Sequence, residues 1–459
     1  ERLADNPLTA PVRVLPVVGR QVRAVGGMAG AAAEIGEIAA DGVEEAAALA
    51  EGGLPTGPGR VDLLDDLADV TDRAAARIAV VDLGPDEALI GPVGSAHDRF
   101  ASEQVGLEES LLDTRDAAAG MAGVFAGPSD YLLLAANNAE MRAGAGMALS
   151  AGVLHFEDGT VELGDMESTA ALQLPGGVEE YDPQLAALWG FANPDEEWRN
   201  LLLSPRYPAS AELGRQMWDQ LGRPPIDGVL TVDIAALQGL LAALGPVEVD
   251  GREISADNVV RLLQHDQYLG VENDEQAERR DRLGDVARAV VDRLDQQGAE
   301  VSPLLSGLRD AAAGRHLLLW SEDRGLQRAW SGIGVGGEPG PDDLLVGVLN
   351  EGNNKLDQFL RVDAELDPGP GRSGRLVLEV TNEVPEGEPA YIAGVAPERV
   401  GGYGVYPGYL AVSLPGGTTA TVAEGPEITL GGPDGDSQMV AALVRIAPGE
   451  TVRWVLDLE

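Results

Sequence analysis

Apolar residues recur with a helical period through the first 125 residues. Segments 63–81 and 97–125 each carry an apolar stripe, and breakers that contain Gly and Pro precede and separate them. A narrow stripe of four-three spacing comes first, formed by Val18, Val22, Val25, Ala29, Ala32 and Gly36. Alanine and glycine dominate all three segments, which favours tight helix packing. The pattern predicts an N-terminal helical bundle or stalk over residues 1–127.

Between residues 128 and 330, short apolar runs alternate with helical patterns. The run 131–136 is typical of a buried strand, and 147–156 with 160–163 predicts a hairpin around an Asp-Gly turn. Further strands are expected at 198–204, 228–232, 247–249 and 317–320. Helices are expected after the capping residues Ser210, Asp233 and Ser255, and the last helix carries an apolar stripe over 283–294. This alternation predicts a sheet covered by helices, an α/β layered core.

The period changes to two after a segment rich in Gly, Pro and acidic residues, 331–342, which we interpret as a linker. Between turns that contain Gly and Pro, apolar and polar residues then alternate at 359–366, 376–380 and 410–414. Short strands of this kind predict a C-terminal β-sandwich over residues 343–459. The predicted fold class is therefore α+β and multidomain, with a stalk, a core domain over 128–330 and a sandwich.

Composition narrows the classes of function. The chain has 459 residues, with 32 basic and 76 acidic side chains and a formal net charge of −44. Nucleic-acid binding needs a basic face, so we expect no nucleic-acid partner. The absence of cysteine excludes disulfides, thiol nucleophiles and Cys-ligated zinc. No apolar run reaches ~18 residues, so no membrane span is expected, although the start at Glu1 leaves an upstream signal or anchor open.

The densest polar motif directly follows the strand expected at 131–136. Its two carboxamides, Asn137 and Asn138, precede Glu140 and Arg142. Layered α/β sheets place ligands at the ends of central strands, and this set could present a fork of hydrogen-bonding groups to a phosphate or a sugar. The alternative is a turn in which the charged residues pair with their neighbours.

Other side chains offer further ligand contacts. Arg279 and Arg282 continue the apolar stripe of the last helix toward its N-terminus, where a bound anion would offset the unfavourable helix dipole. Pairing with nearby acidic residues is the alternative. Arg206 lies in a Ser-Pro-Arg-Tyr-Pro loop, where it either binds an anion or is solvated. Lys355, the only lysine, lies in an Asn-rich segment that either contacts the core domain or forms a polar turn. Three tyrosines in a glycine-rich stretch either stack on a sugar or pack between strands: Tyr403, Tyr406 and Tyr409.

The run 132–142 resembles the leading motif of a bacterial family of envelope proteins, the "domain of unknown function 4012" group, in which an Asn-Asn-x-Glu-x-Arg segment precedes glycines. Further segments resemble that family in the same order, at 6–19, 204–208, 227–247 and 350–357. The resemblance covers almost the whole chain. It implies an envelope protein tethered by an upstream transmembrane helix, and it implies no known reaction.

A weaker resemblance links 227–294 to the LytR–CpsA–Psr family. Those enzymes transfer glycopolymers from a polyprenyl pyrophosphate carrier to the cell wall, using arginines for the pyrophosphate and an acid-bound magnesium. Arg279 and Arg282 resemble the family's Arg-x-x-Arg helix. The segment 204–206 resembles its Ser-Ile-Pro-Arg-Asp loop, without the Ile and with Tyr207 in place of the acid. In the region of the family's preceding Arg-x-Arg pair, this sequence has His265 and Gln267.

These observations predict a membrane-anchored protein at the extracellular face of the cell membrane, acting in envelope glycopolymer assembly. The core would bind a polyprenyl-linked glycan or another cell-wall polymer, and Glu140 or Asp233 would hold Mg²⁺ or accept a proton. Together with Arg142, these two acids are the candidate catalytic residues. The side chains expected to bind the ligand are Asn137, Asn138, Arg142, Arg206, Arg279, Arg282 and Lys355.

The reaction itself stays open at this point. A glycopolymer phosphotransferase would need an apolar tunnel for the polyprenyl tail. A non-enzymatic glycan-binding or structural cell-surface protein is the main alternative, and a filled core would favour it. A glycosidase that uses Glu140 with a second acid such as Asp165 is a third possibility.

Overall fold

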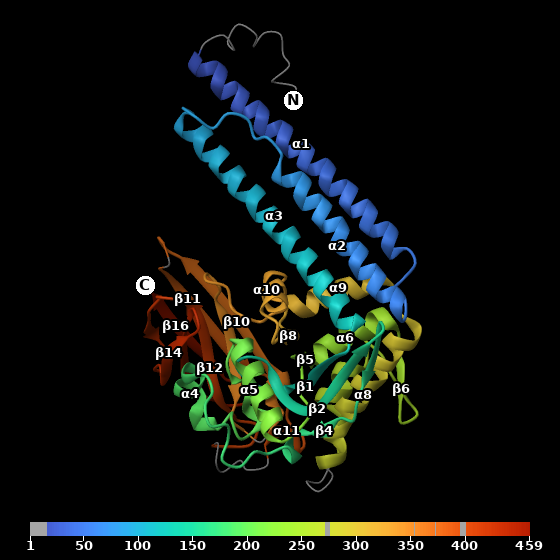
Figure 1. Cartoon of the computed structure of the whole chain (residues 1–459). Helices are drawn as coiled ribbons and strands as arrows, with labels where there is room; N and C mark the ends of the chain where they lie inside the picture. The colour runs from blue at the N-terminus through green and yellow to red at the C-terminus, as the bar shows by residue number, and fades with distance from the viewer. Residues whose placement is uncertain (1–15, 271–275, 353, 372, 395–400) are drawn as a thin grey trace.

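The computed structural model describes residues 16–270, 276–352, 354–371, 373–394 and 401–459. It is a mixed α/β structure with helices at the N-terminal end and antiparallel sheets in the C-terminal region, which confirms the expected fold class at that level (Figure 1). The first three helices form a stalk that extends away from the rest of the molecule: α1 (Pro16–Ala50), α2 (Pro58–Ala79) and α3 (Gly91–Ala126). Within the described residues, no helix is both long and apolar enough to cross a bilayer.

The face that α1 turns toward its neighbours is not the predicted one. Val18 and Val25 are 42% and 52% exposed, whereas Ala24, Ala31 and Ile38 are buried. Small and apolar residues occupy two adjacent faces of this helix, and their spacing does not choose between them. Ile38 of the buried face packs in a cluster with residues of α2 and the loop after it: Ala74, Ile78, Val81 and Leu83.

A six-stranded sheet forms the centre of the core, in the order β3-β2-β1-β5-β8, with β4 paired to β2. The strands are β1 (Ser129–Met141), β2 (Gly146–Glu157), β3 (Thr160–Leu163), β4 (Glu167–Ser168), β5 (Gly228–Asp233) and β8 (Leu317–Ser321). β1 and β5 are parallel, and the other pairs are antiparallel. The hairpin and the strand at 131–136 are confirmed. β1 continues to Met141, however, so most of the polar motif lies within a strand and not in a loop.

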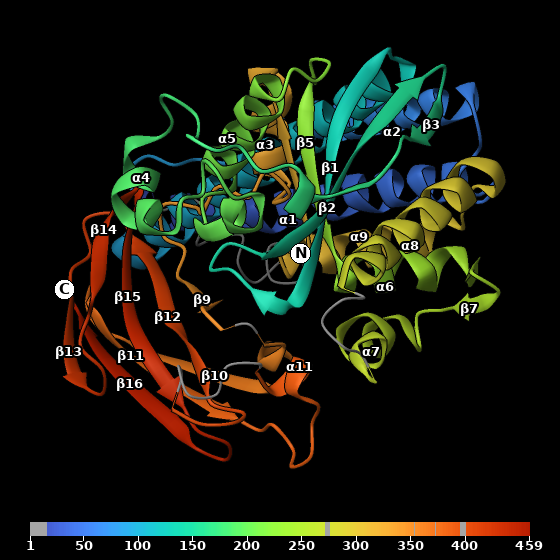
Figure 2. The ribbon, with the colours of Figure 1, turned by 90° about the horizontal axis from the view of Figure 1, so that it is seen from below.

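Helices cover both faces of this sheet (Figure 2). Leu132 and Leu134 of β1 pack on one side with α4 (Pro183–Trp189), η5 (Trp198–Leu203) and α5 (Tyr207–Gln220). On the other side, Tyr131 and Leu133 pack with the end of α3 and with α6 (Ile234–Leu244), α8 (Gln276–Gln297), α9 (Val301–Ala313) and α10 (Arg324–Gly332). The remaining elements of the core are η3 (Thr169–Ala171), η4 (Gly190–Ala192), β6 (Val247–Val249), β7 (Arg252–Ile254), α7 (Val259–Gln264) and η6 (Asp266–Tyr268).

Several predicted elements need correction. The strand expected at 198–204 is the 3-10 helix η5, because a short run of buried apolar residues does not by itself distinguish strand from helix. α5 begins at Tyr207, with a proline in its first turn, so Ser210 lies inside the helix. α7 follows Asn258 and not Ser255. Asp233 does cap α6, as predicted.

Two four-stranded antiparallel sheets form the C-terminal region. One contains β10 (Leu360–Pro368), β11 (Gly374–Asn382), β16 (Thr451–Leu458) and β13 (Ala420–Glu424). The other contains β14 (Leu430–Asp434), β15 (Ser437–Ile446), β12 (Tyr406–Pro415) and β9 (Leu345–Asn350). Side chains from both sheets share one hydrophobic cluster that includes Tyr406 and Trp454. Two short helices, η8 (Leu356–Phe359) and α11 (Ala390–Ala393), complete this region.

The C-terminal sheets pack closely on the core. Ala411 of β12 and Met439 of β15 belong to the same buried cluster as Trp189 of α4, so the core covers part of the outer face of the second sheet (Figure 2). The segment 331–342, interpreted as a linker, is also packed. Val335 is buried, and Gly337 O accepts a hydrogen bond from Tyr207 N.

Candidate functional site

The polar motif lies at the end of β1, facing the C-terminal region. Asn137 is buried, its Nδ2 donates to the Tyr268 hydroxyl at 2.7 Å, and its Oδ1 accepts from Ala139 N. The pairing of β1 with β2 is irregular between Asn137 and Met141. This irregular end of the strand lies against Asn350, Lys355 and Asp357.

Glu140 forms a buried ion pair with the only lysine of the chain. Lys355 Nζ lies 2.8 Å from Glu140 Oε1, and the two side chains are only 6% and 11% exposed. The ammonium group also lies 5.2 Å from the centre of the Tyr268 ring and 4.9 Å from that of Tyr391, which adds two cation–π contacts. Lys355 therefore contacts the core, which is one of the two alternatives that the sequence leaves open. A carboxylate held in this way is not available as an open proton acceptor.

The Arg142 guanidinium is bound to groups of the protein itself. Its Nε donates to Arg199 O and to Asn200 Oδ1, at 3.0 and 3.1 Å. Its Nη1 donates to Met141 O and to Asn350 O, at 3.0 and 3.2 Å. Burial lowers the pKa of this guanidinium, although the charge of Glu140 opposes the effect. Arg142 thus joins β1, η5 and β9, and it does not point into an open anion site.

Asp357 completes this set of buried groups. Its carboxylate accepts hydrogen bonds from Asn350 Nδ2 and, at 3.1 Å, from the Tyr406 hydroxyl. Burial raises the pKa of Asp357 to about 7, despite the hydrogen bonds it accepts from Asn350, the Met141 backbone and Tyr406. We name Asn137, Glu140, Arg142, Lys355 and Asp357 the junction network. Asp357 is not among the residues proposed from the sequence, although it lies in segment 350–357, which carries part of the family resemblance.

Asn138 and Asp233 form a second, more open network at the carboxyl ends of the parallel strands β1 and β5. Asn138 Nδ2 donates to Asp233 Oδ2 at 2.7 Å, and Asp233 Oδ1 accepts from Ala235 N and Ala236 N at the start of α6. His316 Nδ1 lies 2.6 Å from Asp233 Oδ2. The His316 side chain is 36% exposed, and its hydrogen bond with Asp233 raises its pKa. A partly exposed imidazole held by a carboxylate can exchange protons near neutral pH.

His316 has no local sequence signal as a functional residue. It precedes β8 and is brought to Asp233 only because β8 pairs with β5. The pairing of these strands is a long-range feature that periodicity does not reveal.

Arg206 and Arg142 do not converge on one open site. Arg206 lies 3.1 Å from Asp434 and 2.7 Å from Asp182, so two carboxylates already neutralise it. Arg282 is partly buried on α8, and the side chain of Arg279 lies outside the described residues. The expectation that Arg142 and Arg206 share an open phosphate site is therefore corrected. The acidic excess of this sequence supplies a partner for Arg206, and Arg142 takes backbone and amide oxygens instead.

Neither Mg²⁺ chemistry nor glycosidase chemistry fits the proposed acids. Glu140 is occupied by Lys355, and Asp233 by Asn138, His316 and the helix cap. Within the described part of the chain, no group of three or more His, Asp or Glu side chains could hold a metal ion. Asp165 is fully exposed and lies 4.0 Å from Arg288, so it does not share the buried site of Glu140.

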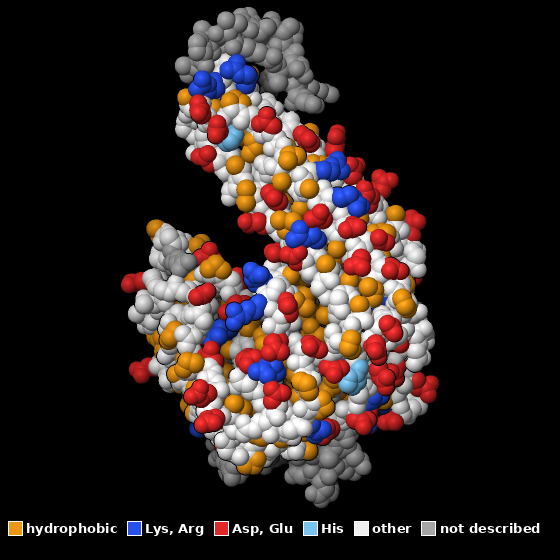
Figure 3. Space-filling view, viewed as in Figure 1, with side chains coloured by type: hydrophobic (Ala, Val, Ile, Leu, Met, Phe, Trp, Pro, Cys, Tyr) orange, Lys and Arg blue, Asp and Glu red, His pale blue; other side chains and the backbone are white. Residues whose placement is uncertain are grey.

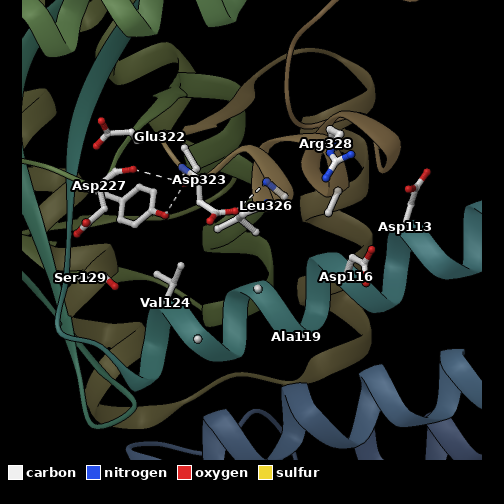
Figure 4. A pocket seen from close by; sticks show the side chains of 16 residues that line it. Asp113, Asp116, Ala119, Val124, Ser129, Asp227, Glu322, Asp323, Leu326 and Arg328 are labelled. Atoms are coloured by element: carbon white, nitrogen blue, oxygen red, sulfur yellow. Dashed lines mark hydrogen bonds between the residues drawn. The ribbon is translucent and has the colours of Figure 1, made fainter.

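A cavity of about 890 Å³ lies at the other end of the sheet (Figure 4). The end of α3, the starts of β1 and α10, and the residues next to β5 and β8 line it. Five carboxylates contribute to the lining, against one guanidinium, that of Arg328: Asp113, Asp116, Asp227, Glu322 and Asp323. Acidic side chains are also spread over the stalk and core on the face shown in Figure 3. Such a lining repels phosphate, so this cavity does not suit a pyrophosphate carrier.

Comparison with known proteins supports part of the resemblance. Residues 126–268 match the family described as "Protein of unknown function (DUF4012)". The DUF4012 region runs from the end of α3 to η6 and contains the motif at 137–142, together with Asp233 and Tyr268. Three residues that contact this region lie C-terminal to the match: His316, Lys355 and Asp357.

Other comparisons add little to the DUF4012 match. A search of curated proteins found no match. A solved structure described as the transcriptional regulator yvhJ from Bacillus subtilis is 12% identical, with a TM-score of 0.24, and the match covers 46% of this chain and 78% of that chain. At that score the likeness supports no conclusion about fold or function.

Proposed function

We propose that this chain is a non-enzymatic structural protein of the cell surface, in which the DUF4012 motif fastens the C-terminal sheets to the α/β core. The observation that carries this proposal is the buried Glu140–Lys355 pair, with its two aromatic rings. Breaking such a pair leaves an uncompensated buried charge, which costs about 3–5 kcal/mol. The pair therefore holds together two segments that are far apart in the sequence.

The other motif side chains support the same function. Asn137 donates a hydrogen bond to Tyr268, Asn138 donates one to Asp233, and Arg142 donates to carbonyl groups. Both faces of the sheet are filled by side chains, including the fully buried Trp189 and Trp198. A filled interior favours a structural role, because a polyprenyl tail needs an apolar tunnel.

The cellular place is part of the proposal. The DUF4012 resemblance implies an envelope protein with an upstream membrane anchor, at the extracellular face, with cell-wall polymer as its partner. In the structure, α1 begins at the end of the stalk farthest from the core (Figure 1). An anchor joined there would separate the core from the membrane by the length of α1, about 52 Å for its 35 residues.

A second candidate is the transfer of a polyprenyl-linked glycan in a LytR–CpsA–Psr-like layout. One observation favours it, the partly exposed His316 held by Asp233 at the carboxyl ends of two parallel strands. This pair could accept the proton of an attacking sugar hydroxyl. The paired states of Arg142 and Arg206 weigh against it, because these two guanidinium groups are already bound within the protein.

The two candidates differ in what the motif residues do, which a mutant series can test. We would compare Glu140→Gln, Lys355→Met and the double variant by chemical denaturation, with the exposed pair Arg375–Asp457 as the matched control. Each single variant should lower the free energy of unfolding by about 3 kcal/mol, and the double variant by less than the sum. Asp457→Asn should change it by less than about 1 kcal/mol.

Ligand binding provides the opposing measurement. Titration with geranylgeranyl pyrophosphate should give no saturable binding to the wild-type chain. Saturable binding that Arg142→Lys abolishes without a loss of stability would overturn the structural proposal in favour of the second candidate.

A further inference from the structure

Three aromatic rings meet where η4 contacts β12. The ring of Phe191 lies 5.9 Å from that of Tyr409 and 6.1 Å from that of Trp189, between centroids, and Trp189 meets Tyr409 edge-on at 6.5 Å. Trp189 is fully buried, whereas Phe191 is 53% exposed and Tyr409 is partly exposed. The buried indole thus supports two rings that keep part of their surface in solvent.

Leu443 extends this surface along the sheet. It is the direct cross-strand partner of Tyr409, so the two side chains leave the sheet on the same face. Leu443 is 44% exposed. We name Phe191, Tyr409 and Leu443 the aromatic platform.

Two charged side chains border the aromatic platform. Arg445 is exposed, and it follows Leu443 by two residues on β15, so it lies on the same face. Glu351 is exposed, and its backbone N donates to Pro407 O, two residues before Tyr409. Burial and the charge of Glu351 together raise the pKa of the Tyr409 hydroxyl, which agrees with a carboxylate near that ring. The platform therefore has an acceptor and a donor at its rim.

The size and chemistry of this surface define its occupant. A stable protein interface needs about 20–30 residues on each side, many more than three apolar side chains between two charges. A pyranose ring presents an apolar face of C–H groups and a rim of hydroxyls. Aromatic rings pack against the apolar face of the sugar, and a carboxylate with a guanidinium can hydrogen-bond to its hydroxyl groups.

We infer that the aromatic platform, with Glu351 and Arg445, binds a short stretch of glycan of one or two pyranose units. One sugar face packs on Phe191 and Tyr409, and its hydroxyls hydrogen-bond to the Glu351 carboxylate and the Arg445 guanidinium. This inference rests on the proposed function at the cell surface and gives it a ligand class. It uses none of the residues of the junction network.

The test is titration of the full chain with three soluble trisaccharides: N-acetylglucosamine trimer, maltotriose and mannotriose. Ligand-observed NMR should detect binding of at least one of them to the wild type. Phe191→Ala should weaken that binding about 10-fold, the size expected for one lost aromatic contact. Glu351→Gln should weaken it as well, whereas Phe191→Trp should retain it.

Tyr403→Ala is the matched control, because Tyr403 is also an exposed aromatic residue, at 47%, and its hydroxyl donates to Glu388 O away from the platform. It should bind as the wild type does. Phe191→Ala should unfold at the wild-type denaturant midpoint, so that lost binding is not lost folding.

The outcomes separate this inference from the structural proposal. If none of the three sugars binds, or if Phe191→Ala binds as tightly as the wild type, the platform is not a glycan site. The fastening role of Glu140 and Lys355 is measured by unfolding alone, so it stands or falls independently.

Discussion

Arg60 Nη1 lies 3.3 Å from Asp295 Oδ1, which joins the first turn of α2 to the end of α8. The same guanidinium donates to Gly159 O in the β2–β3 turn and to Leu294 O, and it lies 5.1 Å from the centre of the Phe125 ring. Arg60 is almost fully buried. One side chain thus fixes the base of the stalk to the sheet and to the helical layer beneath it.

Arg60→Ala should therefore destabilise the whole chain. It removes charge-assisted hydrogen bonds and a cation–π contact, so we expect the free energy of unfolding to fall by about 2–4 kcal/mol in chemical denaturation. Arg99→Ala removes only an exposed pair with Glu103 and should cost less than about 0.5 kcal/mol. Equal effects of the two variants would show that the Arg60 contacts contribute nothing special.

Asp357 makes stability fall as pH rises through the range where its folded and unfolded pKa values differ. Its pKa is about 7 in the folded chain and 3.8 when unperturbed, so the folded state holds the proton more tightly. The stabilisation is complete below pH 4, is lost between pH 4 and 7, and amounts to about 4 kcal/mol. Asp357→Asn should remove this dependence. Unfolding curves at pH 4, 5.5 and 8 check it, and parallel pH profiles for both proteins would contradict the assignment.

The pKa of His316 should depend on the charge of Asp233. The Asp233 carboxylate raises the pKa of His316, so its share of stability is present at low pH and is lost as pH rises through the folded value. Asp233→Asn keeps a good helix cap while removing the charge. In NMR titrations of labelled histidine, His316 should titrate above 6.5 in the wild type and at lower pH in this variant. The other three histidines should not move, and an unchanged His316 midpoint would argue against the contact.

Gly144 permits close passage of the β1–β2 turn over η5. A Cβ added there would lie 2.1 Å from Ser204 O, a backbone atom that cannot rotate away. Gly144→Ala should therefore destabilise the chain by more than about 2 kcal/mol. Gly106→Ala is the matched control, because Gly106 is exposed within α3 and a Cβ there meets nothing within 4 Å. That variant should stabilise the chain by about 0.5–1 kcal/mol in the same thermal unfolding series.

Local features of the fold can be predicted from the sequence. The Asp158-Gly159 turn defines its hairpin, and Asp233 caps its helix through hydrogen bonds two and three residues away. These signals depend only on nearby residues. The strand at 131–136 is equally clear, because a run of six apolar residues has to be buried.

Long-range features could not be predicted in the same way. Glu140 is visible as a candidate charge, but its partner Lys355 lies in another region of the chain, and only the packing of β9 and η8 against β1 joins them. His316 reaches Asp233 through the pairing of β8 with β5. Which face of α1 is buried depends on its packing against α2, and the sequence of α1 alone carries no information about that contact.

The order of strands in the central sheet has a consequence for biosynthesis. β1 pairs with β5 and β5 pairs with β8, but Glu140 has its ion-pair partner at Lys355, and one hydrogen bond of Arg142 goes to Asn350 O. While the ribosome is still translating the middle of the message, Glu140 and Arg142 have no complete set of partners. A nascent chain that ends before residue 350 would bury these charges without all of their partners and would be exposed to proteases. A stable product therefore requires translation of nearly the whole chain.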